Sequence, residues 1–361
     1  MRVLVTGATG LVGGAVVHEL RARGHAVRAL VRPSSDLANL GGPGGGEVEL
    51  AHGDVLDRPS VERALAGCQA VVHAAGLAAI GGVGRDRLFA VNAGGVEVVL
   101  GAALAAGVER AVLTSSASLL WGTLVPCVAD EDTTSSAETL GIDYFVSKLR
   151  GEEVGLDLAA RGLPLAIVRP AFVLGPGDLY RSSASLVLAL ARGRIPAYVQ
   201  GGASFCDVRD VARGHVEALL RGQPGQTYLL GGQNLTMDEF VGRVCRLAGV
   251  KAPLRLPYAV AAAATRAMLL AARLGGPAPA TTLDLLRASR LYTFVTSARA
   301  QRELGYTVRP FEDSVRDTLR WYLARGALRP DTPELRALSA GADRPDGPPR
   351  PDGPAPASRT G

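Results

Sequence analysis

Lysine is almost absent from this chain. Among 39 basic residues only Lys148 and Lys251 are lysine, and every other one is arginine. The arginines are scattered singly, with no basic run and no interleaved aromatic residues. The net charge of +5 therefore does not indicate nucleic-acid binding, which needs a basic patch on one face. We expect no nucleic-acid partner, and the position of Lys148 needs a reason of its own.

Cysteine is scarce as well. Cys68, Cys127, Cys206 and Cys245 lie far apart, without a CxxC pair or a cluster of histidines beside them. This spacing does not match the common zinc motifs, and it indicates reduced thiols in a cytosolic protein. The first residues, MRVLVTGATG, enter a strand at once and lack the layout of a signal peptide. We expect a cytoplasmic protein without a metal site.

The most apolar segment, residues 256–276, is interrupted by Arg266 and Arg273. It is too short and too charged to span a bilayer comfortably. We expect a helix that is buried or covers a pocket, and a helix lying on the membrane surface is the alternative.

The first half of the chain alternates β-branched runs with helical patterns, which is typical of a parallel sheet with crossover helices. Helices are expected at 11–23, 59–66 and 86–106, and in the segment that holds Tyr144 and Lys148. The fold class is therefore α/β, with a Rossmann-type doubly wound parallel sheet. The expected strands are residues 2–6, 26–31, 47–54, 70–76, 110–116 and 164–170.

The alternation weakens beyond residue 175. We expect a nucleotide-binding domain over residues 1–175 and a smaller, mainly helical substrate region over 176–328, interleaved with the core. Residues 329–361 are rich in Pro, Gly and Asp and predict a disordered tail. Within the second region the pattern predicts helices near 180–192, 207–221, 236–248 and 310–325, and an isolated strand-like run at 227–232.

The segment VTGATGLVGG joins the first strand to the first helix and spaces Gly7, Gly10 and Gly13 three residues apart. Glycines let the backbone turn sharply and approach a pyrophosphate, while the helix N-terminus offers free N–H groups. The sequence therefore predicts a dinucleotide site at this junction. A purely structural turn is the alternative.

The end of the second strand is expected beside the adenosine ribose. An acidic residue there would favour NAD, and an arginine would favour NADP. This chain has Arg32, followed by Ser34 and Ser35, so we expect NADP(H) rather than NAD(H). Asp54, which ends the third strand, is expected either to accept a hydrogen bond from adenine or to cap the next helix.

Tyr144 and Lys148 lie one helical turn apart, after the strand that ends in TSSAS. A tyrosine with a pKa near 10 is a poor acid–base catalyst at neutral pH, and a nearby cation brings the pKa toward the working range. A compact ammonium can also reach ribose hydroxyls, which explains a lysine here amid arginines. A chance Tyr-x-x-x-Lys pair is the alternative.

The glycine loop, HGDV, VHAAG, VNAGG, TSSAS, YFVSK and VRPAFVLGPGD occur in one order and spacing over about residues 1–325. In these motifs the chain resembles the extended short-chain dehydrogenases/reductases, and most of all their dihydroflavonol-4-reductase-like branch. That branch includes hopanoid-associated epimerase-like proteins and relatives of 3β-hydroxysteroid dehydrogenase. The resemblance also implies a homodimer through the helices near 86–106 and 143–161.

The resemblance implies roles for individual residues. Tyr144 would be the acid–base catalyst, Lys148 its helper, and Ser116 would hydrogen-bond the substrate oxygen. Asn92 would shape its helix, unless it is an ordinary polar residue there, and Phe172 would face an apolar substrate. The remaining implied cofactor contacts are Thr9, Leu11, Val12, Val55, Ala74, Ala75, Thr114, Pro170 and Val173.

Two departures from the family pattern narrow the reaction. LTSSASLLWGT has no carboxylate beside Ser116, which argues against a sugar-nucleotide dehydratase, and Phe172 replaces the asparagine usual in epimerases. We expect an NADPH-dependent reductase of hydrophobic cyclic ketones such as aromatic polyketides, terpenoids or steroids. The alternatives are an epimerase that returns the hydride and a non-catalytic dinucleotide sensor. The loop LLWGTLVPC and residues 256–274 would line an apolar pocket or would simply be core.

Overall fold

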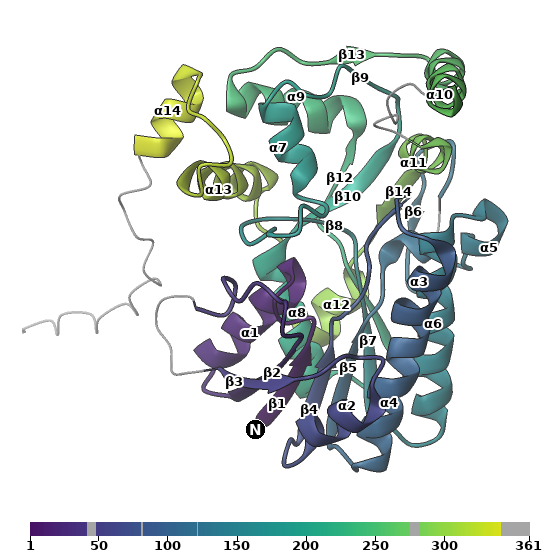
Figure 1. Cartoon of the computed structure of the whole chain (residues 1–361), viewed down its shortest axis with the longest axis vertical. Helices are drawn as coiled ribbons and strands as arrows, with labels where there is room; N and C mark the ends of the chain where they lie inside the picture. The colour runs from purple at the N-terminus through teal and green to yellow at the C-terminus, as the bar shows by residue number, and fades with distance from the viewer. Residues whose placement is uncertain (42–47, 81, 121, 275–281, 341–361) are drawn as a thin grey trace, which may run out of the picture.

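The computed structural model describes residues 1–41, 48–80, 82–120, 122–274 and 282–340. Its centre is a parallel sheet of seven strands in the order β11-β7-β5-β4-β1-β2-β3 (Figure 1). Both faces of this sheet are covered by helices, so its strands, apart from the mostly exposed edge strand β3, consist largely of buried Val, Leu, Ile and Ala. The strands are β1 (Arg2–Thr6), β2 (Ala26–Val31), β3 (Glu49–His52), β4 (Ala70–His73), β5 (Arg110–Thr114), β7 (Leu165–Pro170) and β11 (Thr227–Leu230).

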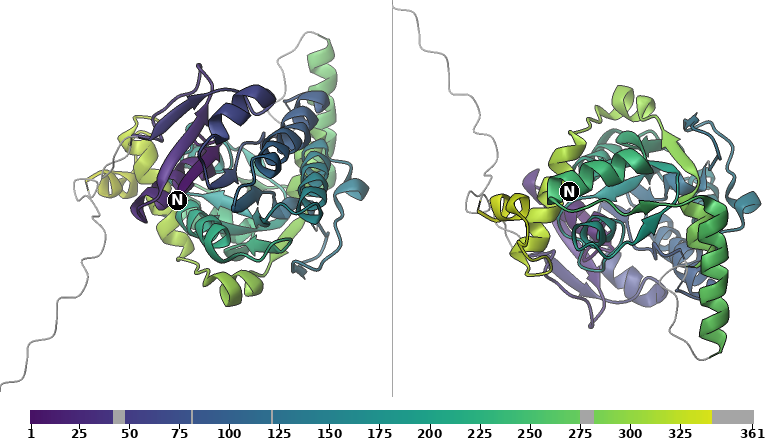
Figure 2. Two further views of the ribbon diagram at one scale, coloured as in Figure 1. Left: turned by 90° about the horizontal axis from the view of Figure 1, so that it is seen from below. Right: turned by 90° about the horizontal axis from the view of Figure 1, so that it is seen from above.

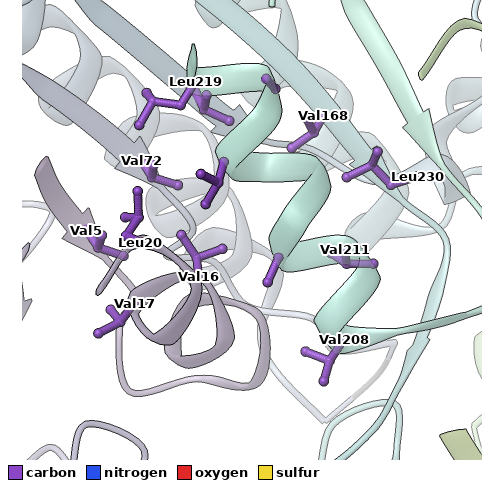
Figure 3. Close-up of a cluster of buried hydrophobic side chains, with 14 of the residues drawn as sticks. Val5, Val16, Val17, Leu20, Val72, Val168, Val208, Val211, Leu219 and Leu230 are labelled. Carbon is purple, nitrogen blue, oxygen red and sulfur yellow. The ribbon is translucent and has the colours of Figure 1, made fainter. Parts of the chain in front are cut away.

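One face of the sheet carries α1 (Leu11–Ala22), α8 (Val208–Arg221) and α12 (Ala298–Leu304). Figure 3 shows Val211 and Leu219 of α8 in one buried cluster with residues of α1 and of the sheet, among them Val16 and Val168. The other face carries α2 (Arg58–Leu65), α4 (Gly95–Ala105) and α6 (Asp143–Ala160). This is the doubly wound Rossmann arrangement, in which ligands bind beyond the carboxyl ends of the strands.

The six strands expected from the sequence are all present, although the third is limited to Glu49–His52. The run at 227–232 is not isolated, because β11 pairs with β7 and forms an edge of the central sheet. The helix expected at 207–221 also belongs to this core, where α8 lies against α1. The chain therefore returns to the first layer after residue 175, which is the interleaving that the sequence indicates.

A second sheet lies beyond the carboxyl edge of the first. Its order is β12-β10-β14-β6, with β8 also paired to β10. These strands are β6 (Val128–Ala129), β8 (Phe172–Leu174), β10 (Gly202–Asp207), β12 (Gln233–Thr236) and β14 (Tyr292–Val295). A short ladder joins β9 (Ala197–Tyr198) to β13 (Leu254–Arg255).

Helices pack around this second sheet on a core of aromatic rings, in which Phe205 and Phe240 stack with their centroids 4.3 Å apart. The capping box of Thr236 and Glu239 starts one of these helices at the position that the sequence indicates. The helices are α7 (Ser185–Ala191), α9 (Met237–Ala248), α13 (Phe311–Ala324) and α14 (Pro333–Ala340), with α10 (Tyr258–Arg273) and α11 (Leu283–Ser289) farther along the edge.

Two expectations about the C-terminal part are wrong. The tail does not become irregular at residue 329, because α14 packs Leu335 into the core between α9 and α13. Residues 341–361 of the expected tail lie outside the described part. The helix at 256–276 is expected to be buried or to cover a pocket, and the first of these interpretations is wrong, since only Ala262 and Thr265 of α10 are buried.

The long helix expected at 86–106 is present, but one of its turns is π-helical rather than α-helical. It runs through α3 (Arg85–Phe89), the π-helical turn η1 (Ala90–Gly94) and α4. By length and composition alone Arg85–Ala105 could cross a membrane, but half of the relevant window is buried inside the protein, as in a core helix. A π-helical turn often marks a functional site. Here it contains Asn92.

Candidate functional site

The glycine loop after β1 is fitted closely to the end of β4. Gly7 has φ +67°, and a Cβ on it would lie 2.6 Å from the Ala75 nitrogen. A Cβ on Gly13 would lie 2.1 Å from the Gly7 carbonyl oxygen. Both contacts are shorter than any real Cβ tolerates, so this turn requires glycine at both positions. Ala74 and Ala75, expected to line the cofactor path, therefore do lie against the loop.

The N-terminus of α1 is uncapped by side chains. Gly10 is the capping residue, the first turn has no acidic residue, and no side chain of the described residues accepts a hydrogen bond from it. The first N–H groups of a helix have no partner within it, and the helix dipole makes this end positive. The closely approaching loop and the free helix end fit a dinucleotide pyrophosphate beside Leu11, Val12 and Gly13.

Asn39 crosses the glycine loop. Its Nδ2 donates to the Thr9 carbonyl (3.0 Å) and to the Gly177 carbonyl (2.8 Å). The Thr9 hydroxyl is also hydrogen-bonded to the Tyr180 hydroxyl (3.2 Å). The segment after β8 is thereby tied to the phosphate loop. The sequence reasoning missed Asn39 and Tyr180, because no local motif shows that residues so distant in sequence meet.

Arg32 follows β2 directly and is exposed. Its backbone N–H donates to the Ser35 hydroxyl (3.1 Å), and its guanidinium makes no hydrogen bond within the described residues. Asp54 accepts a hydrogen bond from the Leu56 N–H (2.9 Å). Asp57 is the capping residue of α2, so the alternative role of Asp54 as that cap is wrong.

Tyr144 lies in the first turn of α6, and its phenol is hydrogen-bonded to the hydroxyls of Ser116 and Ser118. The two serine hydroxyls are 2.7 Å apart, and the Ser118 N–H donates to the Ser116 hydroxyl (3.2 Å). The structure therefore brings Ser116 and Tyr144 together, as expected, and adds Ser118. The repeated serines of TSSAS were the available signal for this third hydroxyl.

Lys148 lies one turn beyond Tyr144 and points to the end of β5. Its Nζ donates to the Thr114 carbonyl oxygen (2.9 Å), and a Cβ on Gly76 would lie 3.3 Å from Nζ. Burial lowers the pKa of Lys148 to about 8, against the opposing charge of Glu152. The ammonium is therefore held beside the carboxyl ends of β4 and β5.

The pKa of Tyr144 differs from the sequence-based expectation. Burial raises it, and the hydrogen bonds from Ser116 and Ser118 are the effects that oppose the rise. We expected Lys148 to lower this pKa, but the ammonium donates to Thr114 and is not among these effects. The phenol of this structure therefore keeps its proton at neutral pH.

Asn92 has a definite structural role. Its Oδ1 accepts from the Leu77 N–H (2.8 Å), and its Nδ2 donates to the Leu77 carbonyl (3.0 Å) and to the Ser147 hydroxyl (2.9 Å). A Cβ on Gly151 would lie 2.0 Å from the Asn92 carbonyl oxygen. The π-helical turn thus fits against α6 and fixes the segment after β4. This confirms that Asn92 shapes its helix and rejects the ordinary polar alternative.

Two buried histidines lie behind the site. The Thr114 hydroxyl is hydrogen-bonded to His215 Nε2 (2.9 Å), and the Thr6 hydroxyl to His73 Nδ1 (2.8 Å). Burial lowers the pKa of His215 to about 4 and, with the charge of Lys148, that of His73 to about 3. Both rings are therefore neutral at physiological pH. The Thr114 hydroxyl is therefore hydrogen-bonded to His215, and the Thr114 carbonyl oxygen accepts a hydrogen bond from Lys148.

Glu152, one helical turn after Lys148 on α6, takes part in a buried ion pair. Glu152 is 3% exposed, and it receives two hydrogen bonds from Arg169 on β7, one from Nε at 2.9 Å and one from Nη2. Arg169 is 8% exposed, and its Nη1 has no hydrogen-bond partner among the described residues. Sequence reasoning did not single out either residue, although Glu152 follows Lys148 by four positions.

The expected contacts after β7 are less well supported. Phe172 is half-buried, and the centroid of its ring lies 5.1 Å from that of Phe205. Its ring therefore packs against the aromatic core around the second sheet. Pro170 and Val173 are buried, and Val173 packs in the core beside Cys206. The side chain of Val55 packs near Gly95. In the expected apolar loop, Trp121 lies outside the described residues.

A family model described as "NAD dependent epimerase/dehydratase family" matches residues 3–231. The chain belongs to this family, the extended short-chain dehydrogenases/reductases, which confirms the resemblance seen in the motifs. Its members and the relatives below are NAD(P)-dependent enzymes that act on hydroxyl or carbonyl groups, and so is this chain.

Three curated relatives illustrate the range of the family. A "Putative dihydroflavonol 4-reductase" of Synechocystis is 30% identical over 90% of this chain and 95% of its own length. "Sterol demethylase protein B" of Methylococcus capsulatus is 34% identical over 91% and 100%. A "4-hydroxy-2-methyl-3-oxo-4-farnesyl-3,4-dihydroquinoline-1-oxide ketoreductase" of Stigmatella aurantiaca is 30% identical over 89% and 96%.

Among solved structures, that of gox2253 is 36% identical to this chain. It covers 91% of this chain and 99% of its own length, with a TM-score of 0.79. The likeness extends well beyond the nucleotide-binding half, so the second sheet and its helices belong to the shared architecture.

Proposed function

We propose that this protein is an NADPH-dependent reductase of a carbonyl group on an apolar cyclic substrate. The observation that carries the proposal is the hydrogen bonding of the Tyr144 phenol by Ser116 and Ser118, with the Lys148 ammonium one turn away. These groups lie at the carboxyl edge of the sheet, where β4, β5 and the glycine loop meet. An acid, an ammonium and a phosphate-binding loop at one edge are what a carbonyl reduction requires.

The residues at the glycine loop fit a dinucleotide. Gly7 and Gly13 leave room for close approach, and the N-terminus of α1 offers free N–H groups to its phosphates. NADPH supplies a hydride to the carbonyl carbon when it is bound. The position of Arg32, exposed directly after β2, supports a preference for the 2′-phosphate of NADP(H).

The proposed catalytic residues are Ser116, Tyr144 and Lys148, with Ser118 as a further hydroxyl. Ser116 and Ser118 hold the carbonyl oxygen, and Tyr144 donates its proton to that oxygen as the carbon is reduced. The raised pKa of Tyr144 keeps the phenol protonated at neutral pH, so the proton that a carbonyl reduction requires is present on this residue. The ammonium of Lys148, which lies at the ends of β4 and β5, would contact the ribose hydroxyls of the bound cofactor.

The apolar substrate class rests on two features. Phe172 lies half-buried at the start of β8, where a polar residue would suit a sugar nucleotide. The relatives described as a sterol-modifying protein and as a farnesyl-dihydroquinoline-oxide ketoreductase act, by their names, on largely apolar molecules. We therefore propose steroid-, terpenoid- or polyketide-like ketones as substrates.

The test is a screen of NADPH oxidation with a panel of hydrophobic cyclic ketones, repeated with NADH and with Arg32→Asp. We expect stoichiometric NADPH oxidation with at least one ketone, and a shift of preference toward NADH in the variant. An epimerase would convert its substrate with no net cofactor turnover. A wild-type preference for NADH would refute the cofactor assignment, and cofactor binding without turnover of any ketone or sugar would support the sensor alternative.

A further inference from the structure

The surface helix α10 is covered on one side only. It lies at the edge of the part of the molecule formed by the second sheet and its helices, and it projects beyond the rest of the molecule (Figures 1 and 2). Tyr258, Ala261 and Ala262 attach it to Leu286 of α11 and to Val199. A helix of this length whose buried contacts are so few presents most of its surface to its surroundings.

The side of α10 that faces away from the protein is apolar. At about 100° per residue, Val260, Leu270 and Leu274 lie opposite the buried Ala262 and Thr265. Their exposed fractions are 51%, 59% and 82%. The same outward side also carries Ala263, Ala264, Ala267 and Ala271. An exposed, contiguous apolar face of this kind marks an interaction surface.

The charges around this face all have one sign. From Lys251 to Leu274 the chain has no Asp or Glu, and its charged residues are Lys251, Arg255, Arg266 and Arg273. Arg266 and Arg273 lie on one flank of the apolar face and form no ion pair within the described residues.

The neighbouring acids are already neutralised. Asp238 pairs with Arg255 at 2.8 Å, and Asp284 of α11 pairs with Arg287 at 3.4 Å. The face is therefore an apolar strip with a positive flank.

We propose that α10 docks this protein on an anionic membrane surface. The strip would enter the boundary between headgroups and acyl chains, and the two flanking arginines would meet anionic headgroups. A second copy of the chain suits the face less well, because an isologous contact would bring the same positive charges together.

The docking face is joined to the candidate site by a short structural path. Leu286 of α11 contacts α10, and Ala288 of the same helix packs against the buried cluster that holds Leu291, as Tyr144 does. A membrane at α10 would thus lie against the part of the molecule that contains the site. The proposal itself does not depend on the proposed function, because membrane binding is measured without turnover.

The test is co-sedimentation of the full chain with vesicles of phosphatidylcholine mixed with phosphatidylglycerol, and with vesicles of phosphatidylcholine alone. We expect binding to the mixed vesicles that weakens as salt is raised. Arg266→Gln with Arg273→Gln should lower the partition coefficient about thirtyfold, which corresponds to about 2 kcal/mol. Leu270→Gln with Leu274→Gln should abolish binding.

The matched control is Leu50→Gln with Val308→Gln, which removes exposed apolar side chains from other elements and should bind like the wild type. Thermal unfolding shows that each variant is folded, and light scattering gives its mass. Failure of the wild type to bind anionic vesicles would overturn the proposal. So would equal loss in the control, or a dimer that becomes a monomer in the Leu270/Leu274 variant without vesicle binding.

Discussion

At the scale of single residues, the position of Lys148 is explained by its surroundings. The ammonium lies where β4 and β5 end, donates to the Thr114 carbonyl, and has Tyr144 and Glu152 one turn before and after it on α6. An arginine would carry a planar fork too large for this place beside Gly76. The sequence predicted the Tyr144–Lys148 pair because both residues share one helix face.

Other residues of the site could not be predicted in this way. Ser118, Asn39 and Glu152 become part of it only through tertiary contacts with Tyr144, Thr9 and Arg169. The pKa of Tyr144 was also mispredicted, because burial depends on packing that the local sequence does not show.

Glu152→Gln tests whether the buried ion pair of Glu152 and Arg169 positions Lys148 and raises its pKa. Loss of the carboxylate leaves Arg169 buried without a counter-charge, so the free energy of unfolding should fall by about 3 kcal/mol. Glu152 raises the pKa of Lys148, so the alkaline limb of kcat/KM, near pH 8, should move to lower pH. Urea unfolding and a pH–rate profile measure the two effects.

Glu153→Gln is the matched control, because Glu153 pairs with Arg150 on the exposed face of the same helix. Its unfolding free energy should change by less than about 1 kcal/mol, and its pH profile should not move. Glu152→Asp, which keeps the charge, should restore the alkaline limb. An unshifted limb in Glu152→Gln would show that the pair serves stability alone.

At the scale of elements, the periodicity of the sequence predicted all seven strands of the central sheet. It did not predict that β11 belongs to this sheet. Buried strands are continuous apolar runs between turn residues, and this pattern is local. The pairing of β11 with β7 is not local, because α7, β10 and α8 intervene. The π-helical turn around Asn92 was also not predicted, because its close packing against Gly151 of α6 is a tertiary contact.

Gly151→Ala tests this close approach. Alanine in a helix interior ordinarily adds up to about 1 kcal/mol of stability over glycine. Here its Cβ would lie 2.0 Å from the Asn92 carbonyl oxygen, so we expect a loss of about 1–3 kcal/mol and a lower kcat as α6 is displaced. Gly101→Ala on α4, where a Cβ has no contact closer than 3.9 Å, should be neutral or stabilising. Equal effects in both variants would contradict the close packing of Gly151 against the Asn92 carbonyl.

At the scale of the whole molecule, stability should depend on pH through the two buried histidines. The unfolded chain binds protons near the ordinary pKa of 6.5, whereas His215 and His73 bind them only near about 4 and about 3. The unfolded state therefore holds more protons below pH 6.5, and acidification favours it. From pH 7 to pH 5 the free energy of unfolding should fall by about 1–2 kcal/mol for each ring.

Urea unfolding at both pH values checks this dependence. His215→Gln should remove about half of it, and His52→Gln, which alters an exposed ring, should leave it unchanged. A flat profile in the wild type would contradict the assignment of neutral, buried rings. The homodimer expected through α4 and α6 stays a prediction at this scale, and light scattering at micromolar concentration tests it.

The central claim is that the Tyr144 phenol, held by Ser116 and Ser118 beside Lys148, gives its proton to a substrate oxygen. Tyr144→Phe removes only that hydroxyl, and the most direct measurement compares its turnover and its NADPH affinity with those of the wild type. We expect turnover to fall by at least about a hundredfold, as for the loss of a general acid, while NADPH binding stays within a few-fold. Unchanged turnover in a variant that binds NADPH normally would contradict the account.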